Sequence, residues 1–196
     1  MFSLSLPVVS RSSSATKPGR GFSLLEVLIT AAIIGVVTAL VVVRYGAFNN
    51  SVLLKSQAFE LALDLREAQV FAISVRGNSS EFREEYGLYF SDSTPGQYLL
   101  FLDDDTIVPA AYEAGEEIGD PYYLDSRFEI DQICSDVNCT NQVSELAVTF
   151  QRPDFDAMIW TNEGSSFSEA RIDISSVSSS EFRSVVITST GQITVE

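Results

Sequence analysis

The segment Gly21-Phe-Ser-Leu-Leu-Glu-Val-Leu-Ile-Thr30 begins an apolar run that continues to Val43 and contains one charged residue, Glu26. At about 1.5 Å per residue, residues 22–43 would form a helix of roughly 33 Å, and the hydrocarbon core of a bilayer is about 30 Å thick. The run therefore predicts a membrane-spanning helix near the N-terminus.

The charges before this run predict its orientation. Arg11, Lys17 and Arg20 precede it, and the first 21 residues contain no acidic residue. Because basic residues stay on the cytoplasmic side of a membrane, we expect the N-terminus in the cytoplasm and the chain after Val43 outside it.

Glu26 is unexpected in a simple membrane anchor. The run is longer than the apolar region of a typical signal peptide, and no small-residue cleavage site follows it. A carboxylate within lipid costs free energy unless it is protonated or paired with a cation. Cleavage between Gly21 and Phe22 would create such a cation, because the new α-amino group would lie about one helical turn from Glu26.

The segment Lys17-Pro-Gly-Arg-Gly21, followed by Phe22-Ser-Leu-Leu-Glu26, resembles the signal of type IV prepilins and type II secretion pseudopilins. The resemblance implies that prepilin peptidase cuts after Gly21 and that the new N-terminal Phe22 is N-methylated. It implies that Glu26 neutralises the terminal amine of a neighbouring subunit in a filament. The implied partners are other pilins or pseudopilins, the peptidase, an inner-membrane assembly platform and, before assembly, membrane lipid.

The composition argues against nucleic-acid binding and against several kinds of catalysis. Removal of residues 1–21 leaves nine basic and 27 acidic side chains, a formal charge of −18. Such a surface repels phosphates, because affinity for nucleic acids comes from Lys and Arg. The chain contains no histidine, which excludes Ser-His-Asp catalysis and His-based zinc sites. We therefore expect no enzyme.

Helical periodicity continues beyond the membrane run. Apolar residues alternate at spacings of four and three, which places them on one face of an amphipathic helix packed on a globular domain. This stripe consists of Leu54, Ala58, Leu61, Leu65, Ala68, Ala72 and Val75. The sequence predicts one helix over residues 22–76 that ends at Gly77-Asn78. Its amphipathic second half comprises residues 44–76. The stretch Leu65-Arg-Glu-Ala-Gln69 resembles the secretion protein H/FimT branch of these families.

Short runs typical of β-strands fill residues 77–196. Pro95-Gly96 and Thr190-Gly191 are turn signals that predict two hairpins. The expected strands are residues 87–91, 97–102, 122–124, 127–133, 146–151, 157–161, 170–174, 183–188 and 192–195. We predict an α+β fold, in which a long N-terminal helix packs on an antiparallel β-sheet domain.

Cys134 and Cys139 are the only cysteines in the sequence. The predicted topology places them in an oxidising compartment, which favours a disulfide, while free thiols remain the alternative. Two cysteines alone make a poor metal site, because other soft ligands are lacking.

Asp103, Asp105 and Glu116 lie in an acidic stretch that raises the hypothesis of a calcium site, since Ca²⁺ takes six to eight oxygen ligands. The spacing does not fit an EF-hand: counted from Asp103, the position that requires glycine is Val108. The alternative is a solvated acidic loop that binds no cofactor.

Three functional classes follow from these observations. The favoured class is a structural one, a minor pilin or pseudopilin in a type II secretion pseudopilus or type IV pilus. The second is a filament-tip subunit that binds DNA for uptake or mediates adhesion. The third is a membrane-anchored enzyme, which the lack of histidine and of a nucleophile motif disfavours.

Overall fold

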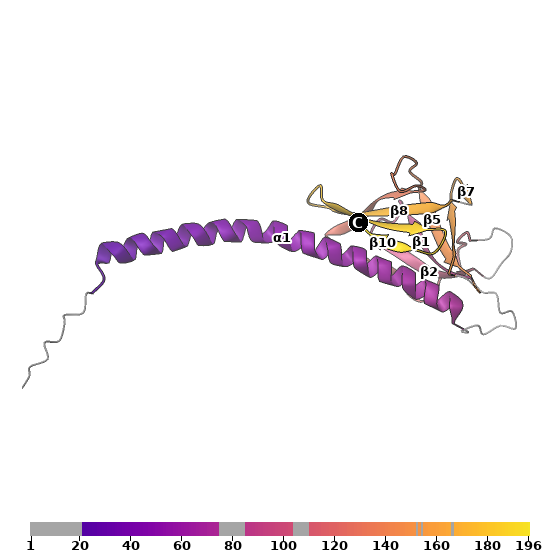
Figure 1. Ribbon diagram of the computed structural model, residues 1–196, viewed down its shortest axis with the longest axis horizontal. Helices are drawn as coiled ribbons and strands as arrows, with labels where there is room; N and C mark the ends of the chain where they lie inside the picture. The colour runs from indigo at the N-terminus through magenta and orange to yellow at the C-terminus, as the bar shows by residue number, and fades with distance from the viewer. Residues whose placement is uncertain (1–20, 75–84, 104–109, 152, 154, 166) are drawn as a thin grey trace, which may run out of the picture. The chain divides into compact units, whose positions relative to one another are not determined.

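The computed structural model describes residues 21–74, 85–103, 110–151, 153, 155–165 and 167–196 (Figure 1). The chain divides between Arg44 and Tyr45 into two units. The first contains the apolar half of helix α1, and the second contains the remainder of this helix and all the strands.

Helix α1 spans Leu24–Ile73. It begins two residues later than predicted, because Ser23 supplies the first helical acceptor: its carbonyl oxygen lies 3.2 Å from the amide nitrogen of Val27. At the other end, the amide nitrogen of Ser74 still donates to the carbonyl oxygen of Val70 at 2.9 Å. The predicted stop at Gly77-Asn78 lies outside the described residues.

The described part of the domain contains ten strands in two antiparallel sheets. The larger sheet has the order β3-β2-β1-β5-β6-β7, and the smaller one has the order β10-β9-β8-β4. The strands are β1 Glu85–Ser91, β2 Gln97–Asp103, β3 Tyr122–Tyr123, β4 Phe128–Cys134, β5 Glu145–Phe150, β6 Ala157–Thr161, β7 Gly164–Ser165, β8 Glu169–Ser176, β9 Phe182–Thr188 and β10 Ile193–Val195.

The α+β class is confirmed, and both predicted hairpins form. Strands β1 and β2 pair antiparallel across the Pro95-Gly96 turn, and β9 and β10 pair across the Thr190-Gly191 turn. The arrangement differs from the prediction in one respect, because the strands divide between two sheets and do not form a single one. Strand β7 was not predicted, since two residues are too few to show an alternating pattern.

The predicted helical stripe forms one side of the core. Its described members are all at most 1% exposed: Leu54, Ala58, Leu61, Leu65, Ala68 and Ala72. Val75 lies outside the described residues. The stripe belongs to one buried cluster with residues of both sheets, among them Leu88 of β1 and Ile172 of β8. The amphipathic half of α1 is therefore held by the domain that follows it in the sequence, as Figure 1 shows.

Candidate processing and assembly segment

The predicted cleavage position lies in non-helical backbone. Gly21, Phe22 and Ser23 precede helix α1, and Phe22 is 82% exposed. A Cβ atom added to Gly21 would meet no atom of the described residues within 4 Å. Their packing therefore does not require glycine at position 21, so a requirement for glycine would be expected from an external partner.

Glu26 occupies the first turn of α1, and its side chain is exposed. Because the carbonyl of Ser23 accepts the first helical hydrogen bond, Ser23 is the N-cap residue and Glu26 is the third helical residue. The spacing Ser-x-x-Glu is that of a capping box, and a carboxylate at a helix N-terminus also interacts favourably with the helix dipole. This local reason for an acid at position 26 was readable from the sequence, but the interpretation of Glu26 as a pairing residue overlooked it.

The apolar half of α1 is not covered by other described parts of the chain. Residues Leu24–Val42 are long and apolar enough to cross a membrane, and none of this stretch is buried. Its large side chains, such as Leu24 at 83% and Val42 at 66%, are far more exposed than is usual for apolar residues. Exposure on this scale in water is unfavourable by about 25 cal/mol per Å², which makes lipid or other apolar helices the expected surroundings.

A disulfide joins Cys134 at the end of β4 to Cys139, with 5.1 Å between the Cα atoms. The loop between them is held by Asp136, whose carboxylate accepts hydrogen bonds from the backbone and hydroxyl groups of Thr140 and from the amide of Asn141. The hydrogen bond from the Thr140 hydroxyl is the largest cause that lowers the pKa of Asp136. The bridge therefore closes a short and internally bonded loop.

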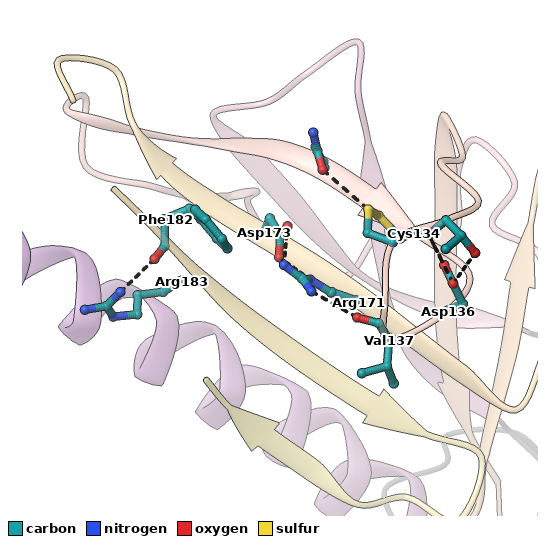
Figure 2. Close-up of polar contacts among 10 residues, drawn as sticks. Cys134, Asp136, Val137, Arg171, Asp173, Phe182 and Arg183 are labelled. Carbon is teal, nitrogen blue, oxygen red and sulfur yellow. Dashed lines mark hydrogen bonds and ion pairs between the residues drawn. A yellow bond between two sulfur atoms is a disulfide. The ribbon is translucent and has the colours of Figure 1, made fainter. Parts of the chain in front are cut away.

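Arg171 of β8, in the smaller sheet, donates a hydrogen bond to this loop (Figure 2). Its Nη1 donates to the carbonyl oxygen of Val137 at 3.0 Å, while its Nε lies 2.7 Å from Oδ1 of Asp173. The hydrogen bond to Asp173 raises the pKa of Arg171. The guanidinium of Arg171 is thus engaged within the domain and is poorly placed to bind a phosphate.

Two of the proposed calcium ligands, Asp103 and Glu116, lie on neighbouring backbone segments, because the amide of Leu102 donates to the carbonyl oxygen of Glu116 at 3.0 Å. Asp103 is 3% exposed, and its Oδ2 accepts a hydrogen bond of 2.8 Å from the amide of Ala110. The Oε2 of Glu116 accepts one of the same length from the amide of Glu113. Asp105 lies outside the described residues, and within them no group of three or more potential metal ligands occurs. Calcium binding therefore stays an untested prediction.

Comparison with known proteins identifies the N-terminal segment. Residues 17–42 match the family model described as the prokaryotic N-terminal methylation motif. This match contains the predicted cleavage position, Glu26 and most of the apolar run, and it ends before the domain begins. No curated protein and no solved structure matches the chain. The comparison supports a type IV pilin-like prepilin and leaves the type of filament undetermined.

Proposed function

We propose that the chain is a minor pilin or pseudopilin, a structural subunit that enters a type IV pilus or a type II secretion pseudopilus through helix α1. One observation carries the proposal: a prokaryotic methylation motif coincides with an apolar helix whose side chains nothing in the described chain covers. A helix of this kind is stable in lipid before assembly, and it can exchange lipid contacts for contacts with other apolar helices. The function is assembly, with no catalytic turnover.

The proposed maturation divides the chain into four parts. Prepilin peptidase removes the leader 1–21, residues 22–43 anchor the subunit in the inner membrane, residues 44–76 connect to the domain, and residues 77–196 form the extracytoplasmic β-rich part. The partners are other pilins or pseudopilins and the inner-membrane assembly platform. Neither a cofactor nor an enzymatic activity is part of this proposal.

Mass spectrometry of the chain from cells that contain prepilin peptidase tests the cleavage. The mature chain should begin at N-methylated Phe22. A Gly21→Ala variant should still be cut, whereas Gly21→Leu should remain uncut, because the open surroundings of Gly21 leave steric selection to the peptidase. A chain that retains its leader in such cells, or efficient cleavage of Gly21→Leu, would overturn the assignment to prepilin peptidase.

We propose that Glu26 pairs with the amine of Phe22 in a neighbouring subunit. A charge buried in a bundle of apolar helices is tolerated only when it is paired, so this contact would also set the register between subunits. The capping-box position of Glu26 offers a competing explanation, and the two can be separated. Gln can replace Glu in a capping box but carries no charge.

Three variants at position 26 distinguish these roles. If pairing matters, Glu26→Ala and Glu26→Gln should both reduce recruitment into filaments, while cleavage at Gly21 continues and Glu26→Asp retains part of the recruitment. If capping alone matters, Glu26→Gln should assemble like the parent chain and only Glu26→Ala should fail. Normal incorporation of Glu26→Gln would therefore refute the pairing role, and the measurement is the amount of the subunit in sheared filaments.

A filament-tip role in DNA capture is disfavoured by the pairing of two arginines of the β-rich part with acidic residues. Arg171 is bound to Asp173, and Arg127 forms an exposed ion pair of 2.7 Å with Asp125. DNA binding requires basic side chains that are free to replace counterions at phosphates. A gel-shift assay at low salt should show no retardation of DNA by the chain.

A further inference from the structure

A second apolar stripe runs along the domain half of α1, on the side away from the core. It consists of Val52, Phe59, Leu63 and Val70, which are 51%, 48%, 59% and 59% exposed. The spacings of seven, four and seven residues bring all four onto one line of a helix with 3.6 residues per turn. We call these four residues the outer stripe.

The outer stripe lies on the helix face opposite the buried stripe. At about 100° per residue, the four side chains lie within about 40° of one another. Around the axis of α1, Leu61 and Leu65 point roughly 160° away from the outer stripe. Both are at most 1% exposed and belong to the core. Single exposed apolar residues are common on protein surfaces, but four of them aligned along about 27 Å of one helix face form a candidate interaction site.

The two flanks of the outer stripe carry charges of opposite sign. Lys55 and Arg66 lie along one flank, and Glu60 and Glu67 lie along the other; all four are exposed. Among the described residues, the ion pairs are Arg127 with Asp125 and Arg171 with Asp173, so none involves these four flanking charges.

Within the described part of the chain, the contacts of these flanking groups pair none of them with an opposite charge. The Nζ of Lys55 lies 5.7 Å from the ring centroid of Phe59, and Oε2 of Glu60 accepts a hydrogen bond of 2.5 Å from Gln57. The Nη2 of Arg66 lies 3.4 Å from the carbonyl oxygen of Ile193, a contact that leaves its charge without an acidic partner. The charges are therefore available to a second molecule.

This distribution of charge selects a parallel partner. When two identical helices face each other in parallel, the basic flank of one meets the acidic flank of the other; in an antiparallel pair, like flanks meet. In parallel coiled coils the residues beside the seam form such interhelical ion pairs and determine orientation. Lys55 precedes Glu60 by five positions, which is the separation that brings these flanking residues together in a parallel pair without stagger.

We propose that the outer stripe binds the outer stripe of a second copy of this chain, in parallel and in register, with Lys55 of each copy beside Glu60 of the other. The contact uses only the domain half of α1. It goes beyond the proposed function, because it requires neither cleavage at Gly21 nor growth of a filament. Two membrane-anchored copies with the same orientation would already satisfy it.

Crosslinking with a short bis-maleimide in membranes that contain the full-length chain tests the pairing. The native cysteines are joined in a disulfide and present no thiol. Val52→Cys and Val70→Cys should each form a dimer with itself, because like positions face each other in a parallel pair. A mixture of the two variants should form no heterodimer beyond background, since about 27 Å of helix separates these positions. Ser180→Cys, on the exposed turn after β8, is the control for random collision.

Charge exchange provides the second measurement. In the Val52→Cys background, Lys55→Glu or Glu60→Lys alone should lower the dimer yield about two- to fivefold, a range typical for exposed ion pairs, and the combination of both should restore it. Dimer yields no higher than those of Ser180→Cys would overturn the proposal. So would crosslinking confined to the Val52→Cys and Val70→Cys mixture, which indicates antiparallel pairs. The same assay in cells without prepilin peptidase should give the same result, so failure of the processing hypothesis would not affect it.

Discussion

Tyr98 on β2 donates a hydrogen bond from its hydroxyl to the carboxylate of Asp64 on helix α1. Tyr98 is 4% exposed, and its ring stacks on that of Tyr122 with 5.4 Å between the centroids. Burial raises the pKa of Asp64, and the hydrogen bond from Tyr98 opposes that rise. The contact thus joins the amphipathic half of the helix to the larger sheet by a polar interaction.

Tyr98→Phe should therefore destabilise the domain by about 1 kcal/mol, because Asp64 loses its donor while the ring stacking is kept. The pKa of Asp64 should rise further, since its burial would no longer be offset by the hydrogen bond. Thermal unfolding of the detergent-solubilised chain measures the stability. Tyr123→Phe is the matched control, because Tyr123 is 71% exposed, and it should leave the unfolding midpoint unchanged. Equal midpoints for both variants would show that the hydrogen bond contributes nothing.

Gly191, in the β9–β10 turn, should tolerate no side chain. Its φ is +76°, and an added Cβ would lie 1.8 Å from the carbonyl oxygen of Phe155. Nε2 of Gln69 donates to that oxygen at 3.0 Å and to the carbonyl of Gly191 at 3.2 Å. Gly191→Ala should cost at least about 2 kcal/mol, through left-handed backbone strain and displacement of this helix contact.

Gly96, in the β1–β2 turn, supplies the control for this substitution. An added Cβ at Gly96 would meet no atom of the described chain within 4 Å, so Gly96→Ala should change stability much less than Gly191→Ala. Urea unfolding of both variants gives the comparison. A loss of the same size at both positions would indicate that the close approach of Phe155 is not what requires glycine at position 191.

The Cys134–Cys139 bridge should contribute a modest part of the stability. Closing so short a loop reduces the entropy of the unfolded chain by an amount worth about 2 kcal/mol in the loop-closure model. Replacing both cysteines with serine should lower the free energy of unfolding by about that amount, and reductant should destabilise the parent chain but not the variant. The hydrogen bonds around Asp136 should keep the loop ordered when the bridge is absent. A parent chain indifferent to reductant would contradict the prediction.

The sequence was sufficient to predict the local elements. Apolar spacing located the buried side of α1, because Leu54 to Ala72 repeat at the helical period, and turn residues such as Pro95-Gly96 separated the strands. Which distant strands pair was not predictable in the same way. Strand β4 pairs with β8, and β1 pairs with β5, through contacts that only the packed core determines.

Two features of α1 were present in the sequence but were not predicted. The outer stripe was missed because Val52, Phe59, Leu63 and Val70 lie among charged residues, and the stronger buried stripe accounted for the periodicity. The capping position of Glu26 is expressed only by the spacing Ser23-x-x-Glu26, and a charge within an apolar run is the more prominent feature of this segment. The start of α1 at the Ser23 carbonyl reveals the capping position. The exposure of the helix face that the domain does not cover reveals the outer stripe.

Glu85 should make the stability of the domain depend on pH. Its partner across the β1–β2 ladder is Asp103, and its Oε2 is buried without a hydrogen-bond partner among the described residues. Burial, with a smaller contribution from the charge of Asp103, raises the pKa of Glu85 from 4.5 to about 7. The folded state therefore holds this proton more tightly than the unfolded chain does.

The direction in which stability changes with pH follows from this difference in proton binding. Between about pH 4.5 and pH 7 the folded state binds more protons at position 85 than the unfolded state, so stability should fall as pH rises through this range. Glu85→Gln should remove that part of the pH dependence, because an amide resembles the protonated acid and does not titrate. The unfolding midpoints of the two chains should thus be similar at pH 4 and diverge by pH 8, where the variant should be the more stable. A parent chain that gains stability relative to Glu85→Gln over the same range would mean that the carboxylate of Glu85 is favoured in the folded state.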